Sequence, residues 1–123
     1  MTKRSQISVR HSGEVAVFDI IGYLTEDSEE ALISAYEQEK VQGCPKILLN
    51  FDEESFITSS GFGLIVKLLW RLREKKQVLR VAHPSHQVRR IFNTIGLTRN
   101  SKGPESTRTT EIFESEEDAL AGF

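Results

Sequence analysis

The sequence is poor in the residues that several functional classes require. It holds a single cysteine, Cys44, so an intramolecular disulfide is impossible and a thiolate metal cluster would lack its second sulfur. This cysteine content is typical of a reducing compartment. No apolar run is long enough to span a bilayer, and the early positive charges of residues 1–10 are not followed by the apolar stretch of a secretory signal. We therefore expect a cytoplasmic protein that does not insert into a membrane.

The sequence also lacks a large excess of either positive or negative charge. The 123 residues include 16 lysines and arginines against 18 aspartates and glutamates, which gives a formal net charge of -2. A protein that binds nucleic acid through its phosphates needs a basic excess on one face, so we expect no nucleic-acid partner. With 38% hydrophobic and 28% charged residues the composition is that of a globular protein, and the length suits one domain over residues 1–123.

The motif of serine hydrolases is missing. A hydrolase elbow places a glycine two residues before the nucleophile, but Ile57 and Thr58 occupy that place for Ser59 and Ser60. Neither serine therefore fits the nucleophile of such an enzyme.

The residue patterns that nucleotide binding, metal binding and thiol catalysis require are missing as well. Residues 61–63 make two thirds of a dinucleotide fingerprint, but its third glycine position is Val66, and a phosphate-binding Lys-Ser/Thr loop is absent. His83 and His86 have no carboxylate at helical spacing to complete a metal site. No base is evident beside Cys44. We therefore expect a protein that is not an enzyme and that holds no cofactor and no metal.

Hydrophobic periodicity predicts alternating strands and helices. The patterns place strands at 7–9, 14–24, 46–51, 78–82 and 111–113, and helices at 25–43, 60–75, 84–95 and 115–120. The nearly continuous apolar run 46–51 is typical of a strand buried on both faces and should be central. We expect Ser28 and Ser115 to cap their helices and Gly96 to end the third helix. This order predicts an α/β fold, with a mixed sheet of about four to five strands and about four helices.

Two adjacent serines stand where the second helix begins. The first turn of a helix leaves backbone N–H groups unpaired and carries partial positive charge, so a hydroxyl there either caps the helix or, once phosphorylated, is held by those donors. Ser59 and Ser60 take this position, with Ser60 as the expected cap. Gly61 and Gly63 remove side chains where a partner could approach closely. The local sequence leaves simple capping and regulated phosphorylation both open.

Residues 47–97 resemble the bacterial STAS-domain family, in particular its anti-sigma-factor antagonists. That family has a strand ending in Leu-Asn or Leu-Asp, a short loop, and then Asp-Ser-Ser/Thr-Gly-Leu-Gly at the start of a helix. The counterparts here are 49–50 and 58–63, followed by a Phe-x-x-x-Gly-Leu ending at 92–97. Residues 111–120 are similar to the family's closing strand and helix. The resemblance covers nearly the whole chain.

The resemblance implies a non-enzymatic partner-switching regulator. In such proteins the serine after the family's aspartate is phosphorylated by a serine kinase that is also the anti-sigma factor. The unphosphorylated antagonist binds this kinase and frees the sigma factor, and a phosphoserine phosphatase resets the switch. Carried over by position, the phosphate acceptor is Ser59, ahead of Ser60 and Thr58. The implied partner-binding residues are Asp52, Glu53, Thr58, Ser59, Ser60, Gly61, Phe62 and Gly63.

One residue departs from the family pattern, because Thr58 stands where the family has aspartate. This favours an alternative, a STAS scaffold or transporter-accessory subunit whose binding does not depend on phosphorylation. A third interpretation is small-ligand or nucleotide binding at the same helix N-terminus, which the missing phosphate-binding motif disfavours. Neither the residues nor the resemblance specifies an oligomeric state.

Overall fold

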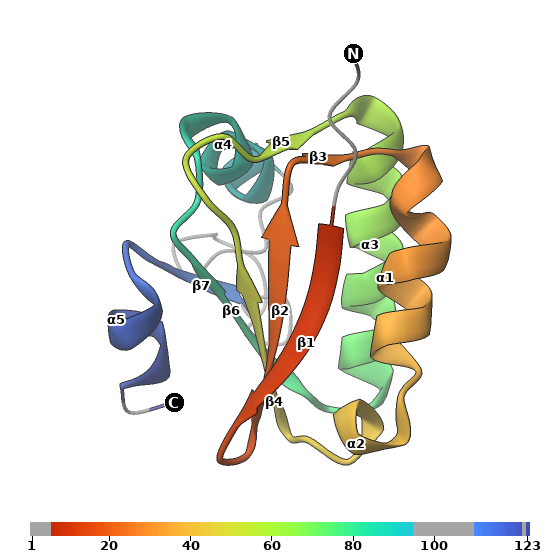
Figure 1. Cartoon of the computed structure of the whole chain (residues 1–123), viewed down its shortest axis with the longest axis vertical. Coiled ribbons are helices and arrows are strands. Elements are labelled where there is room, and N and C mark those ends of the chain that lie inside the picture. Colours follow the sequence, from red (N-terminus) through yellow and green to blue (C-terminus); the bar gives the residue numbers. More distant parts are fainter. Residues whose placement is uncertain (1–5, 95–109, 122) are drawn as a thin grey trace.

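The computed structural model describes residues 6–94, 110–121 and 123, and strands alternate with helices along the chain (Figure 1). Its strands are β1 (Gln6–Ser12), β2 (Val15–Ile21), β3 (Tyr23–Leu24), β4 (Lys46–Asn50), β5 (Phe56–Ile57), β6 (Val78–Ala82) and β7 (Thr110–Phe113). Its helices are α1 (Glu29–Tyr36), α2 (Glu39–Gln42), α3 (Ser59–Glu74), α4 (His86–Thr94) and α5 (Glu116–Leu120), with a 3₁₀ turn at Glu26–Ser28. The predicted end of the third helix, at Gly96, lies outside the described residues.

Five strands form a mixed sheet with the order β1-β2-β4-β6-β7. β1 and β2 make an antiparallel hairpin, and the other neighbours pair in parallel. The central strand is β4, as its apolar run predicted. Ile47 and Leu49 belong to the core on one face, Leu48 to the core on the other, and all three are fully buried. The predicted α/β fold with a mixed sheet is therefore confirmed.

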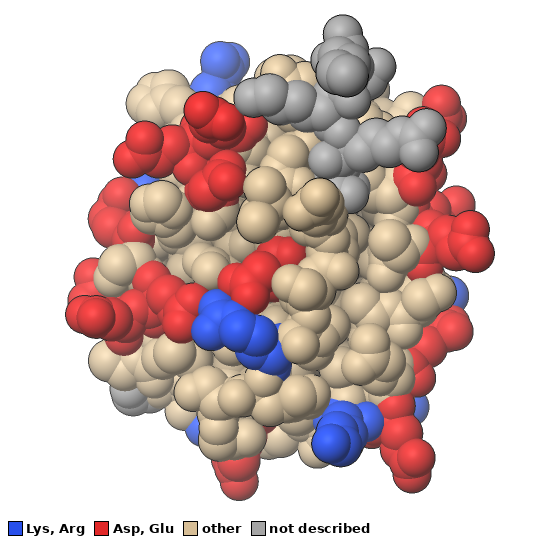
Figure 2. Space-filling view, viewed as in Figure 1, with Lys and Arg blue, Asp and Glu red and all other residues tan. Residues whose placement is uncertain are grey.

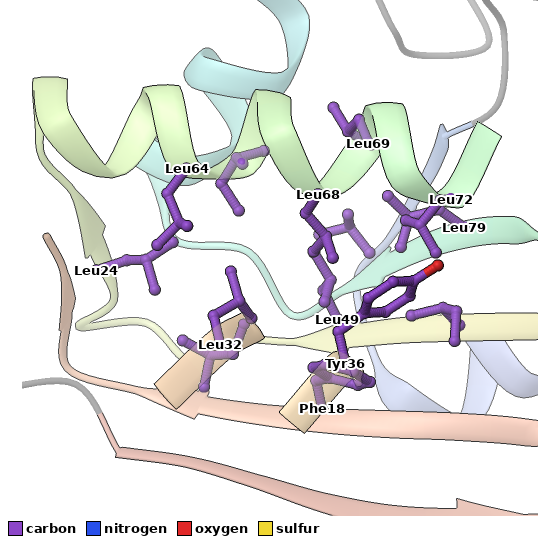
Figure 3. Packing of buried hydrophobic residues seen from close by; sticks show 14 of the residues in the cluster. Phe18, Leu24, Leu32, Tyr36, Leu49, Leu64, Leu68, Leu69, Leu72 and Leu79 are labelled. Atoms are coloured by element: carbon purple, nitrogen blue, oxygen red, sulfur yellow. The ribbon is translucent and has the colours of Figure 1, made fainter. Parts of the chain in front are cut away.

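Helices α1 and α3 cover one face of the sheet, and α5 lies against the other (Figure 1). The larger core is on the first face, where burial of apolar side chains supplies most of the stability. The side chains that α3 buries there are Leu64, Ile65, Leu68, Leu69 and Leu72. Figure 3 shows Leu68 and Leu72 pointing from α3 toward the strands that carry Leu49 and Leu79. Phe62, in the first turn of the same helix, is half-buried and packs against this core.

The predicted helix 25–43 is interrupted at Gln38, whose extended backbone (φ -60°, ψ 136°) separates α1 from α2. At its start, Thr25 Oγ1 accepts the N–H of Asp27 at 3.1 Å, and Thr25 rather than Ser28 begins the helical segment. The predicted cap at Ser28 is wrong, because the Ser28 hydroxyl accepts the N–H of Thr25 at 3.0 Å and makes no capping bond to α1. The two residues form a capping box around the 3₁₀ turn.

The predicted strand that ends at Leu24 is two strands. Gly22 has a φ of +91°, a left-handed conformation that favours glycine, and it ends β2. Beyond this turn β3 leaves the main sheet and pairs in parallel with β5. Tyr23 lies opposite Phe56 in this two-stranded ribbon, with 5.3 Å between their ring centroids. The ribbon runs directly into α3 and so fixes the place where that helix begins.

An ionic network fastens α5 to the second face of the sheet. Arg10 of β1 donates hydrogen bonds to Asp19 of β2 at 2.9 Å and to Glu116 of α5 at 3.3 Å. The Arg10 guanidinium holds the pKa of the Asp19 carboxyl below its usual range. Asn50 donates to both carboxylates. As predicted, Ser115 caps α5, and its hydroxyl accepts a first-turn N–H at 3.1 Å.

Figure 2 shows the face of the molecule on which β1 lies. Acidic side chains gather along both sides of this face, and the basic ones are few and separate. The drawn face therefore presents no broad basic surface among the described residues. In the same part of the chain, no helix is both long enough and apolar enough to cross a bilayer.

Candidate functional site

Residues 52–63 lie at one end of the molecule, where β3, β5, α4 and the first turn of α3 meet (Figure 1). α3 begins at Ser59, and Thr58 precedes it with extended backbone (φ -76°, ψ 171°). Thr58 Oγ1 accepts the N–H of Gly61 at 3.1 Å, which makes Thr58 the N-cap. The predicted cap at Ser60 is therefore wrong, because the threonine two residues earlier caps the helix.

The Thr58 hydroxyl is engaged on both sides. Besides accepting from Gly61, it donates to the backbone oxygen of Leu24 at 3.3 Å. The N–H of Thr58 donates to the same oxygen at 3.0 Å, which ties the cap to β3. An aspartate at this position would keep the capping acceptor but would have no proton to donate to Leu24. Threonine therefore preserves the capping bond that the family's aspartate can make.

Ser59 and Ser60 are exposed in the first turn of α3. Their hydroxyls form no hydrogen bond with any other residue that the structure describes. The first helical hydrogen bond runs from the N–H of Phe62 to the backbone oxygen of Thr58 at 2.8 Å, so the N–H groups of the two serines stay outside the ladder. The two hydroxyls therefore lie beside backbone donors, at the positive end of a helix of 16 residues.

Gly61 and Gly63 occupy different surroundings. Gly61 is buried, and a Cβ atom there would lie 2.1 Å from the backbone oxygen of Leu24. The close approach that Gly61 permits is thus to β3 of the same chain. Gly63 is exposed, and a Cβ atom there would meet nothing within 4 Å. Of the two glycines, Gly63 leaves bare surface near the serines.

An open groove of about 500 Å³ runs beside Ser59. Its lining residues are Phe56, Ile57, Thr58, Ser59, Phe62, Gln87 and Ile91. Phe56 is 40% exposed and its neighbour Tyr23 36%, so aromatic surface flanks the groove. Exposed aromatic side chains of this kind are typical of protein interaction sites. Thr58, Ser59 and Phe62 are among the partner-binding residues that the resemblance implied. The contributions of β5 and α4 carry no local signal, because these elements meet only in the folded chain.

The acidic loop before β5 is held by its own side chains. Asp52 Oδ1 accepts the N–H of Glu54 and the hydroxyl proton of Ser55, each at 3.0 Å. Glu53, the other acidic residue that the resemblance assigns to partner binding, is exposed. Asp52 therefore shapes the loop, and Glu53 is accessible from outside.

The remaining candidate groups do not line this groove. The Sγ atom of Cys44 lies 3.8 Å from Nδ1 of His11 and donates to the backbone oxygen of Lys40 at 3.1 Å. The prediction that no base stands beside this thiol is therefore wrong, because β1 brings a histidine from 33 residues away. Among the described residues, no group of three or more His, Cys, Asp or Glu side chains is placed to hold a metal ion.

Substitution of Thr58 tests its capping role. Thr58→Val keeps the shape and removes the hydroxyl, and we expect it to lower the free energy of unfolding by about 1 to 2 kcal/mol, the usual cost of a lost N-cap. Thr58→Asp keeps the acceptor for Gly61, so we expect a change within about 0.5 kcal/mol. Urea denaturation of the wild type and both variants measures the difference. Equal stability of Thr58→Val and the wild type would show that the cap contributes nothing.

Comparison with known proteins identifies the family. The family model of the STAS domain matches residues 6–119. Among solved structures, the chain is similar to the Bacillus cell fate determinant SpoIIAA in its phosphorylated form, with 22% identity, coverage of 94% of this chain and 96% of that chain, and a TM-score of 0.67. The anti-sigma factor antagonist SpoIIAA in its unphosphorylated form gives 20% identity, coverage of 94% and 93%, and a TM-score of 0.64.

A third similar structure is an anti-sigma factor antagonist from Mycobacterium paratuberculosis, with 16% identity, coverage of 95% of this chain and 92% of that chain, and a TM-score of 0.64. At these identities the likeness shows a shared fold. No curated protein sequence matches the chain. Because the family model spans most of the sequence, the chain belongs to the STAS domain family, and its structural neighbours are anti-sigma factor antagonists.

Proposed function

We propose that this chain is an anti-sigma factor antagonist that works by partner switching, without a catalytic step of its own. Its unphosphorylated form binds a serine-kinase anti-sigma factor, which then releases its sigma factor. Phosphorylation of Ser59 by that kinase ends the binding, and a phosphoserine phosphatase restores it. One observation carries the proposal: Ser59, the first residue of α3, is exposed at the edge of the groove that Phe56 and Tyr23 flank. Because ATP and sigma factors belong to the cytoplasm, the proposal places the protein there.

Three hydroxyl residues stand in a row, and their surroundings favour Ser59 as the phosphate acceptor. The Thr58 hydroxyl both donates and accepts, so its oxygen is held between Leu24 and Gly61. Ser60 is exposed but does not line the groove. Ser59 is exposed and lines it, so a kinase that docks on the groove would reach Ser59 first.

A phosphate on Ser59 would change the charge of the surface far more than the shape of the domain. It adds about 1.5 to 2 negative charges at neutral pH. Within the chain, the first-turn N–H groups and the helix dipole would stabilise it. When a partner covers the groove, the same charge would lose water without gaining a paired cation, at a cost on the order of several kcal/mol. Phosphorylation would therefore lower affinity without unfolding the domain.

The docking surface that we propose joins the groove to the bare helix surface beside it. Its members are Tyr23, Glu53, Phe56, Ser59, Phe62 and Gly63. The backbone of a partner can approach closely at Gly63, where a Cβ atom would meet nothing within 4 Å. The aromatic pair offers apolar area that a complementary surface of the kinase can bury.

Thr58 was the reason to consider a phosphorylation-independent scaffold or a transporter-accessory subunit. Its side chain makes the capping bond that an aspartate would make there. The chain therefore keeps a side-chain cap on the Ser59 turn despite this departure from the family pattern, which supports partner switching over the scaffold. Nucleotide binding at the same turn gains no support either, since the groove is lined by apolar and uncharged side chains rather than by basic groups that hold phosphates.

Release of a sigma factor tests the proposal. A purified serine-kinase anti-sigma factor is loaded with its sigma factor, the chain is added without ATP, and the mixture is separated by size-exclusion chromatography. We expect the sigma factor to elute alone and the kinase to elute with this chain. Gly63→Trp fills the bare surface without entering the core, so it should abolish the release. A kinase that keeps its sigma factor in the presence of excess wild-type chain would contradict the proposal.

A further inference from the structure

β5 is hydrogen-bonded along both of its edges, although among the described residues it has one neighbouring strand, β3. On one edge, the N–H of Thr58 donates to the backbone oxygen of Leu24 in β3 at 3.0 Å. On the other edge, the N–H of Ile57 donates to Oε1 of Gln87 at 2.9 Å, and Nε2 of Gln87 donates to the backbone oxygen of Ile57 at 2.6 Å. The side-chain amide of Gln87 thus makes the pair of hydrogen bonds that a third strand would make.

Ser85 fastens the same helix to the same segment. Its hydroxyl donates to the backbone oxygen of Ser55 at 2.6 Å and accepts the N–H of Val88 at 3.1 Å, so one group both docks and caps α4. Ser85 and Ser55 are buried, and Val88 packs in the larger core. The first turn of α4 is therefore attached to residues 55–57, which run directly into the cap and Ser59.

We propose that Gln87 is a positioning residue for the phosphate acceptor, a role that rests on the proposed function of Ser59. Ile57 lies two residues before Ser59 and is 2% exposed, so the amide that holds its backbone fixes where α3 starts relative to α4. Both helices line the groove, through Phe62 of α3 and Ile91 of α4. With Gln87 in place, a docking partner meets Ser59 and both walls of the groove in one fixed geometry.

Loss of this amide would lower both the affinity for the partner and the stability of the folded chain. Without Gln87, the N–H and carbonyl groups of Ile57 lose their partners, and the segment before Ser59 must be ordered on binding rather than beforehand. Ordering a segment at an interface subtracts from the binding free energy, because conformational entropy is lost in the complex. If the Gln87 amide served stability alone, its removal would lower the affinity only by the fraction of the protein that becomes unfolded.

Gln77 provides a matched control at the far end of α3. Its side-chain amide also bridges main-chain groups, donating to the backbone oxygens of Val41 at 3.2 Å and Cys44 at 2.7 Å. Gln77 is buried, and it follows a helix whose 16 residues span about 24 Å. Gln77 Oε1 also accepts the hydroxyl of Tyr36 at 2.6 Å. Gln77→Leu therefore removes at least as many hydrogen bonds as Gln87→Leu, at a distance from Ser59.

The experiment compares Gln87→Leu, Gln87→Glu and Gln77→Leu in the full chain, at a temperature where each is folded. Amide hydrogen exchange followed by NMR reports on the N–H of Ile57, and titration calorimetry reports the affinity for the serine-kinase anti-sigma factor. For Gln87→Leu we expect exchange at Ile57 to be at least about ten-fold faster and binding at least about ten-fold weaker. Gln77→Leu should leave both within about two-fold of the wild type.

Gln87→Glu separates the two hydrogen bonds of the amide. It keeps an acceptor for the Ile57 N–H, so we expect exchange at Ile57 to stay slower than in Gln87→Leu. Its carboxylate stands in the groove lining, so any loss of affinity in this variant measures the added charge, as in Ser59→Glu. Binding by Gln87→Leu at wild-type strength, or an equal loss in Gln77→Leu, would overturn the positioning role while the proposed function stands. If Gln87→Leu does not fold, the uncharged variant Gln87→Met, which also removes both hydrogen bonds to Ile57, takes its place in both measurements. A wild-type chain that binds no kinase overturns the proposed function, and the role of Gln87 with it.

Discussion

Replacement of Gly61 by alanine is expected to lower the free energy of unfolding by about 3 kcal/mol or more. A Cβ atom at this position would lie 2.1 Å from the backbone oxygen of Leu24 and 2.8 Å from its carbonyl carbon. Because backbone cannot rotate aside as a flexible side chain can, β3 or α3 must shift, and overpacking of this kind costs about 1 to 3 kcal/mol. The shift also disturbs the two hydrogen bonds from Thr58 to Leu24, which adds to the loss.

Gly63→Ala is the matched control for this prediction. The same substitution two residues later on α3 meets nothing within 4 Å, and alanine is the better helix former. We expect Gly63→Ala to leave the stability unchanged or to raise it by up to about 1 kcal/mol. Urea denaturation curves of the wild type and both variants give the comparison. Similar stabilities for Gly61→Ala and Gly63→Ala would contradict the close packing of α3 on β3.

Ser59→Glu is expected to weaken binding to the serine-kinase anti-sigma factor at least ten-fold, a loss of about 1.4 kcal/mol. The new carboxylate would stand at the edge of a groove lined by apolar and uncharged side chains, and a partner would have to bury it without a counter-ion. Ser59→Ala removes only a hydroxyl that bonds to no other described residue. We therefore expect its binding to stay within about three-fold of the wild type.

Ser60→Glu controls for the charge itself. It places the same carboxylate one residue later, at an exposed position that does not line the groove, and we expect no more than about a three-fold loss of affinity. Titration calorimetry with the purified kinase measures all three variants. Equal losses for Ser59→Glu and Ser60→Glu would assign the effect to general charge repulsion. Equal binding by Ser59→Glu and Ser59→Ala would contradict the proposal that phosphorylation of Ser59 ends the binding.

The main sheet could be predicted from the sequence because its signals are local. The apolar run of β4 marks a strand buried on both faces, and the apolar spacing of α3 marks a helix that packs on it. The ribbon of β3 and β5 could not be predicted in this way. Each of these strands has two residues, too few to show a period, and their pairing depends on the left-handed turn at Gly22.

At the candidate site, the start of a helix beside two serines could be predicted, and the acceptor role of Ser59 came from the family resemblance. The cap could not be assigned, because threonine and serine are both capping residues and only the extended backbone of Thr58 distinguishes it. The contribution of α4 to the lining of the groove also could not be predicted from the sequence. Gln87 contacts Ile57 across 30 residues of sequence, a separation at which periodicity says nothing.

Location of the phosphate tests the proposed switch most directly. The purified chain is incubated with ATP and the serine-kinase anti-sigma factor, and tandem mass spectrometry then locates any added phosphate in the wild type, in Ser59→Ala and in Ser60→Ala. We predict one phosphate, on Ser59, which is lost in Ser59→Ala and kept in Ser60→Ala. A phosphate on Thr58 or Ser60, or a stable complex with the kinase in which the chain stays unmodified, would contradict a switch at Ser59.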